Sequence, residues 1–194
     1  MKKKFLEQSS KYMPYVLLAG LALLFVITRF WRITTLPSGV HIDEAGMAYD
    51  AWCLSQYGVD RYFKSYPLLL TNFGGGGQSA LCIYTTALLF RLFGFHSFLF
   101  RVTNIFYSLL TVVFGMLILR KLYPDRPYLA IAGGYLMTIL PFFILSARLG
   151  MDCHPILGTS TVFIYCFLCA LQSEKYRYYV LAGITGGIVL YTYS

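Results

Sequence analysis

The chain has 194 residues, of which 58% are apolar or aromatic and only 12% are charged, whereas soluble domains carry about a quarter charged residues. Its mean hydropathy is +0.63. This composition excludes an ordinary water-soluble domain and predicts that lipid surrounds most of the chain. The net charge of +8 comes from basic residues that form short clusters between apolar stretches. Membrane topology and contact with anionic lipid headgroups explain such clusters, so we expect membrane lipid and not nucleic acid as a partner.

Five apolar stretches have about the length that a membrane-spanning helix needs. They lie near residues 12–33, 102–119, 127–147, 153–173 and 178–194. The first follows a basic start, MKKKFLEQSSKY, and resembles a signal peptide, but no small-residue cleavage site follows it. Arg29, Phe30, Trp31 and Arg32 instead predict an interfacial anchor. The last stretch runs into the end of the chain, which suggests that these residues are the N-terminal part of a longer protein. The predicted fold class is an all-α polytopic transmembrane protein.

The five cysteines and three histidines predict neither a disulfide framework nor a metal centre. Their spacing matches no secreted framework and no zinc-ligand pattern. Cys166 and Cys169 form a CxxC inside the apolar stretch TVFIYCFLCALQ, where packing between helices is the simpler interpretation. His41 and His154 are single imidazoles, which are poor candidates for metal ligands.

The connection over residues 34–96 is long enough to be functional rather than a simple linker. Within it, IDEAGMAYDAWCLSQYG predicts a short amphipathic helix on the membrane face, with Asp43 as N-cap and Gly58 as its C-terminal stop. The apolar stripe of this helix would consist of Ile42, Ala45, Ala48 and Trp52.

A second apolar segment in this connection, QSALCIYTTALLF, is too short to cross the membrane. Gln78 or Ser79 would cap it. The glycines at 74–77 precede it and predict a turn. A phosphate-binding loop is disfavoured because no Lys-Ser/Thr pair follows the glycines and no strand is expected before them.

The distribution of basic residues sets the predicted orientation. If the segment near residues 78–90 does not cross, nine of the sixteen basic residues are cytoplasmic, and if it crosses, seven are. The clusters RKLYPDR and SEKYR also lie in short loops, where charge matters most. We therefore expect an integral protein of the plasma membrane, the inner membrane of a bacterium, with a cytoplasmic N-terminus and with residues 34–96 external. This topology places six charged residues on the external face: Asp43, Glu44, Arg91, Arg101, Arg148 and Asp152.

The adjacent carboxylates Asp43 and Glu44 are the sharpest chemical signal in the chain. A partly desolvated carboxylate at the membrane boundary could accept a proton from a hydroxyl group, or could hold a divalent cation against a phosphate. The alternative is structural, with Asp43 capping the helix and Glu44 favouring its positive end.

Three arginines are candidates for binding a phosphate on the same face. Arg148 ends an otherwise uncharged span, where an ionisable group is functional by default, although it could also reach the interface or pair with Asp152. Arg101 and Arg91 could instead simply end helices at the headgroups.

Three segments of the sequence resemble the GT-C membrane glycosyltransferases, and in particular the protein O-mannosyltransferases and the bacterial lipid A aminoarabinose transferases. The segment HIDEAGMAYDAW is similar to the Asp-Glu pair that opens a surface helix in their first external loop. The segment YTTALLFRLFGFHSFLFRVTNIFYSLLTVV resembles their aromatic surface helix, Leu-Phe-Gly turn and second span. The segment ILSARLGMDCHP resembles their Ser-Arg and Asp element.

The resemblance implies a GT-C-like N-terminal module, with juxtamembrane helices in the external loop. Its implied activity is inverting transfer of a sugar from a polyprenyl-phosphate donor to an acceptor hydroxyl on the external face. By position, Asp43 takes the role of the catalytic base, and Glu44 supports it or shares a cation. One departure is that TNFGGGGQSAL stands where the aminoarabinose transferases carry a Glu-Lys-Pro element, for which Lys64 and Arg61 could substitute.

Two further interpretations remain open from the sequence. One is a transporter or lipid-flipping component, which would need charged residues along a path through the spans. The other is a truncated, non-catalytic relative that acts as an assembly partner.

Overall fold

The structure is a computed structural model that describes residues 2–151, 153–173 and 175–192. Helices dominate the described residues, together with one two-stranded antiparallel sheet, β1 and β2. In chain order the elements are α1 (Lys2–Phe30), α2 (Ile42–Tyr57), β1 (Leu70–Thr71), β2 (Gly77–Gln78), α3 (Ala80–Phe93), α4 (Ser97–Leu122), α5 (Pro127–Ile139), α6 (Pro141–Arg148), α7 (Pro155–Leu171) and α8 (Tyr176–Leu190).

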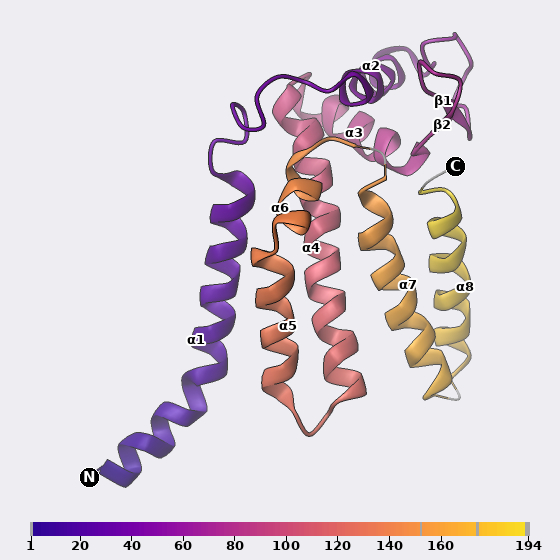
Figure 1. The fold of residues 1–194 in the computed structure, drawn as a ribbon. Helices are drawn as coiled ribbons and strands as arrows, with labels where there is room; N and C mark the ends of the chain where they lie inside the picture. The colour runs from indigo at the N-terminus through magenta and orange to yellow at the C-terminus, as the bar shows by residue number, and fades with distance from the viewer. Residues whose placement is uncertain (1, 152, 174, 193–194) are drawn as a thin grey trace.

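The long apolar helices form a bundle, and the two surface helices cover one end of it (Figure 1). Helix α4 is central, because it packs against α5, α6 and α7, while α7 also packs against α8 and α1 against α5. Helices α2 and α3 pack on each other at the end of the bundle where α1 stops. Helix α3 is apolar but has only 14 residues, which agrees with the prediction that it does not cross the membrane.

Two helices in the described residues are long and apolar enough to cross a membrane by themselves. They are α4 and the Tyr12–Phe30 part of α1, and α5 with α6 makes a third if the bent pair counts as one span. Helix α7 is apolar but only 17 residues long, and α8 has 15 residues. Within the described residues each of the five predicted stretches thus contains a helix, although only the first two meet the full length for a span as continuous helices.

The predicted span over residues 127–147 is broken, which corrects the expectation of one continuous helix. The chain bends by 60° between α5 and α6. Pro141 is the cause, because it has no N–H for the carbonyl four residues earlier and its ring disfavours helical geometry at Leu140. Leu140 is accordingly extended, with φ −62° and ψ 129°.

Helix α2 forms where the sequence predicts it, but its N-cap and its buried face differ from the expectation. His41, not Asp43, is the N-cap: its Nδ1 accepts the Asp43 N–H at 3.3 Å, and the Glu44 carboxylate accepts the His41 N–H in return. Gly58 ends the helix as predicted, with a positive φ of 70° that glycine adopts without strain. The predicted apolar stripe is not the buried face. The buried face consists of Glu44, Gly46, Met47, Asp50, Ala51, Cys53, Leu54 and Ser55.

The glycine cluster at 74–77 forms the turn of a small hairpin. Asn72 shapes it, because its Oδ1 accepts the N–H groups of Gly74 at 2.9 Å and of Gly76 at 2.8 Å. The short strand β1 precedes the turn, which the sequence analysis did not expect. Ser79 caps α3 by accepting the Cys82 N–H at 3.3 Å, so of the two predicted caps Ser79 is the one observed.

The two ends of the bundle carry different groups of residues. Figure 1 places the start of α1, the α4–α5 turn and the α7–α8 turn at one end. The connection over residues 34–96 and the end of α6 lie at the opposite end. The basic clusters RKLYPDR and SEKYR are therefore on the side of the N-terminus, and the candidate site residues are on the other side. Asp152 lies outside the described residues.

Candidate functional site at the end of the helix bundle

Glu44 and Arg101 form a buried ion pair at the start of α2 and α4. Arg101 Nε donates to Glu44 Oε1 at 2.7 Å, and both side chains are about 95% buried. Gly150 lies directly against this pair, since a Cβ there would come within 2.8 Å of Glu44 Cγ and 2.1 Å of the Phe100 ring. The pair therefore fixes the first turn of α2 against α4 and the end of α6.

Arg101 also holds the segment that joins α1 to α2. Its Nη1 donates to the carbonyl oxygens of Ile33 at 2.7 Å and Pro37 at 3.3 Å, and its Nη2 donates to that of Gly39 at 2.7 Å. With the bonds to Glu44, these contacts occupy all five N–H groups of a guanidinium. Arg101 thus has no donor left over for a ligand in this arrangement.

Arg148 holds the same segment from the other side. It donates to the carbonyl oxygens of Thr28 at 2.9 Å, Trp31 at 2.7 Å and Leu36 at 2.9 Å. The guanidinium groups of Arg148 and Arg101 are near enough to repel each other. The structure therefore brings Arg148 and Arg101, two of the three predicted arginines, close together, and both bind backbone carbonyls in the last turn of α1 or in the segment after it.

Asp43 differs from Glu44 in being accessible. Its side chain is 35% exposed, and its Oδ2 lies 3.3 Å from Nδ1 of His41, the ring nitrogen that accepts the Asp43 N–H. No lysine or arginine forms an ion pair with Asp43 among the residues that the structure describes. The two adjacent carboxylates therefore have separate environments, one locked in an ion pair and one open.

The remaining basic candidates form no ion pair with Asp43 among the residues that the structure describes. Arg91 is exposed at the end of α3 and donates to the Ser55 carbonyl at 2.9 Å. Ser55 is twelve residues beyond Asp43, which corresponds to about 18 Å along a helix. Arg61 is bound to the buried Asp50, with Nε to Oδ2 at 2.9 Å, and stacks on the Phe73 ring. Lys64 is exposed in the adjacent loop.

The residues described here fit a resident divalent cation poorly. The Glu44 carboxylate already neutralises Arg101, so a cation on Glu44 would compete with a buried guanidinium. Among the described residues, no group of three or more His, Cys, Asp or Glu side chains is placed to hold a metal ion. We derive no chemical step through a metal.

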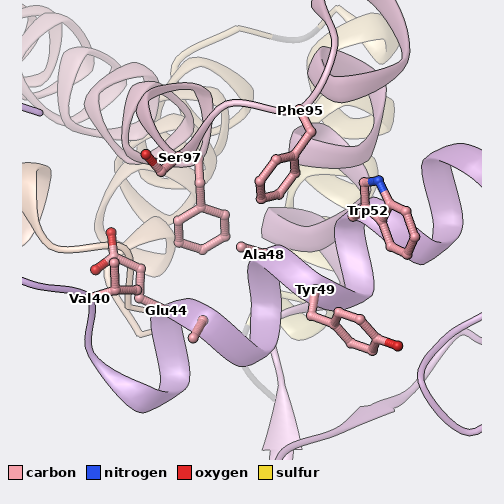
Figure 2. Close-up of a pocket in the computed structure, with 9 residues that line it drawn as sticks. Val40, Glu44, Ala48, Tyr49, Trp52, Phe95 and Ser97 are labelled. Carbon is pink, nitrogen blue, oxygen red and sulfur yellow. The ribbon is translucent and has the colours of Figure 1, made fainter.

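An apolar groove of about 420 Å³ lies beside Glu44. Figure 2 shows Phe95 extending from the α3–α4 turn toward the face of α2 that carries Ala48 and Trp52, with Glu44 and Val40 at the other end of the groove. Part of the predicted apolar stripe, Ala45, Ala48 and Trp52, thus lines an open groove, and Ala48 and Trp52 also pack against the edge of the core while only partly buried. Glu44 is the only charged residue among those that line the groove.

Cys53, on the other side of α2, is not a candidate nucleophile. Burial raises the pKa of its thiol, so the thiol stays protonated at neutral pH and the reactive thiolate is scarce.

Arg29 does not have the role of interfacial anchor that the sequence predicts for it. Its side chain is completely buried and is not an interfacial anchor, whereas Trp31 is 67% exposed. Arg29 Nη2 donates to the Met137 carbonyl at 3.1 Å, and Nη1 donates to the Thr138 carbonyl. No carboxylate pairs with Arg29 among the side chains that the structure describes. The sequence did contain a signal for this role, because Arg29 is a charged residue within an apolar span. Pro141 indicates where backbone carbonyls lack a helical donor and can bind the arginine.

The apolar bundle defines an integral membrane protein, and Asp43 and Glu44 lie at one end of it. Residues 78–194, more than half of the chain, match the family described as dolichyl-phosphate-mannose-protein mannosyltransferase. The chain belongs to this family of membrane glycosyltransferases, which use a polyprenyl-phosphate-linked sugar. No curated protein and no solved structure matches the chain.

Proposed function

We propose that the protein transfers a sugar from a polyprenyl-phosphate donor to an acceptor hydroxyl at the external face of the plasma membrane, with inversion at the sugar carbon. The observation that carries this proposal is that the two adjacent acidic residues lie in different environments. Asp43 is open and has no arginine or lysine partner among the described residues, while Glu44 is held by Arg101 directly behind it. Such a site offers one free carboxylate on a rigid support, which suits a general base.

Asp43 would take the proton from the acceptor hydroxyl as the acceptor oxygen bonds to the anomeric carbon of the sugar. The bond from that carbon to the phosphate oxygen breaks at the same time, and its electron pair stays on the polyprenyl phosphate. A single displacement of this kind inverts the anomeric centre, because the acceptor and the leaving phosphate lie on opposite sides of it. No cation besides the arginines is needed for the charge balance of this step.

The leaving phosphate gains negative charge, which a hydrogen-bond donor aimed at its oxygen atoms would stabilise. Arg148 is our assignment, because its hydrogen bonds to backbone carbonyls use three of the five N–H groups of a guanidinium. Arg101 is saturated, so we assign it to positioning the first turn of α2 through Glu44. We do not assign Arg91 to the phosphate, because it lies near the far end of α2, and we regard it as a surface cation.

The apolar groove supports the same substrate class. It begins at Glu44 and continues along Ala48 to Trp52 and Phe95, so it would accept an isoprenoid chain next to the carboxylate pair. Burial of each methylene there is worth about 0.8 kcal/mol. The external orientation is supported by the basic clusters at the opposite end of the bundle, which favour the cytoplasm.

The test is replacement of Asp43 by Asn in membranes that contain the expressed protein and radiolabelled mannosyl polyprenyl phosphate. We expect the release of free polyprenyl phosphate to be lost while binding of the labelled donor is retained. Asp125→Asn is the matched control, since Asp125 lies in the exposed α4–α5 turn at the other end of the bundle. Unchanged turnover in the Asp43 variant would remove the mechanism. Donor binding without turnover in the unmodified protein would favour the non-catalytic subunit.

A further inference from the structure

Asn104 is a buried polar residue on α4 that the proposed chemistry does not use. It is 1% exposed, and both atoms of its amide, Oδ1 and Nδ2, lack a hydrogen-bond partner. Asn104 lies seven residues into α4, which corresponds to about 10 Å from the helix start. At this depth in a membrane protein, an amide without partners costs several kcal/mol for each unsatisfied group.

The side chain of Asn104 lines a small cavity between three helices. The other lining residues come from α4, α6 and α7 and the residue that precedes α7: Ser108, Thr111, Phe143, Ser146, Ala147, His154 and Leu157. The volume open to the centre of a water molecule is about 10 Å³, which is close to the minimum that one bound water needs. A lipid chain or a sugar does not fit.

The hydroxyl groups in this cavity have acceptor capacity left. Ser146 Oγ donates its proton to the Phe142 carbonyl at 2.7 Å, and Thr111 Oγ1 donates to the Tyr107 carbonyl at 3.1 Å. Each hydroxyl oxygen keeps lone pairs that can accept from a ligand in the cavity.

The polar atoms of the cavity that lack a hydrogen-bond partner indicate which ligand fits it. The Nδ2 of Asn104 needs an acceptor and its Oδ1 needs a donor, while Ser146 and Thr111 offer acceptors. A metal cation would satisfy the oxygens but repel the Nδ2 protons, and an anion would satisfy Nδ2 but not Oδ1. A water molecule both donates and accepts, and it meets two to four polar partners in such sites.

We infer that the cavity beside Asn104 is a binding site for one ordered water molecule that joins α4, α6 and α7. Ser146 is two residues before Arg148, and Asn104 is three residues after Arg101, so both arginines lie one turn or less from residues of this cavity. The water therefore links α6 to α4 and α7 close to the charged site. This inference does not depend on the proposed glycosyltransfer.

The test is radiolytic hydroxyl footprinting of the full protein in ¹⁸O-labelled water, because radiolysis of a bound water marks the side chains next to it. Phe143, which lines the cavity, should be labelled more than Phe114, a similarly half-buried ring on α4 that packs on Tyr165. In Asn104→Leu, which has nearly the same size but no amide, the excess at Phe143 should be lost. Thr161→Val should keep it, because the Thr161 hydroxyl bonds only carbonyls of its own helix.

Labelling of Phe143 no greater than that of Phe114 in the unmodified protein would overturn the inference, whether or not any variant folds. Excess labelling that survives in Asn104→Leu would also overturn it, since the amide would then not hold the water. Should that variant fail to fold, Ser146→Ala removes one acceptor while keeping Asn104, and a reduced excess at Phe143 is expected; an unchanged excess would count against the site.

Discussion

Glu44 Oε1 accepts a hydrogen bond from Arg101 Nε at 2.7 Å across 57 residues of sequence. This contact joins the surface helix α2 to the long apolar helix α4, and it gives Glu44 a buried environment that its neighbour Asp43 does not share. The same arginine binds three carbonyls of the segment after α1. The first turn of α2 is thus fixed by one buried charge pair, and the accessible carboxylate is carried on that turn.

Replacing Glu44 by Gln should destabilise the protein strongly, because it leaves the Arg101 guanidinium buried without a counter-charge. Removal of one partner of a buried pair costs about 3–5 kcal/mol. The measurement is the free energy of unfolding in detergent micelles. A double-mutant cycle with Arg101→Met isolates the charge effect: in the Arg101→Met background no guanidinium is left uncompensated, so Glu44→Gln should cost much less there, whereas additive losses would contradict the charge argument.

The positions of the helices followed from sequence features that act locally. Apolar length located α1 and α4, Gly58 marked the end of α2, and Ser79 capped α3. The roles of Arg101 and Arg148 could not be read in the same way, because their partners are backbone carbonyls. Every residue has a carbonyl, so such a partner leaves no pattern in the side chains.

The proposed orientation of the bundle predicts which residues an impermeant maleimide reaches in intact cells. In a background without the five native cysteines, Lys64→Cys should be labelled from outside and Asp125→Cys only after the membrane is opened. Both positions are exposed, so reagent access and not burial decides the result. Labelling of Asp125→Cys alone in intact cells would place the carboxylate pair on the cytoplasmic side.

Filling the apolar groove should weaken use of the lipid-linked donor. Ala48→Trp introduces a large ring between Trp52 and Phe95. We expect the KM for the donor to rise about tenfold or more, since the loss of two buried methylene contacts is worth about 1.6 kcal/mol. Turnover at saturating donor should change less, because Asp43 is not altered. Leu88→Trp is the control on the exposed surface of α3, and an equal KM for both variants would exclude the groove as the chain site.

Arg29 stabilises the break that Pro141 introduces between α5 and α6. Pro141 cannot donate an N–H to the Met137 carbonyl, and Arg29 Nη2 supplies that donor at 3.1 Å from another helix. Arg29→Met should therefore destabilise the protein by about 2–4 kcal/mol, because two buried carbonyls lose their donor. Arg32→Met is the matched control, since Arg32 is exposed, and its effect should stay within about 0.5 kcal/mol.

A double-mutant cycle with Pro141→Ala tests this cause directly. Alanine restores an N–H at position 141, so the Met137 carbonyl regains a donor from its own helix and Arg29→Met should cost less in that background, by about 1 kcal/mol. The free energies of unfolding of the four proteins in detergent give the coupling. Additive effects would mean that Arg29 stabilises the bundle through its stacking on Phe25 and not through the carbonyls that the proline exposes.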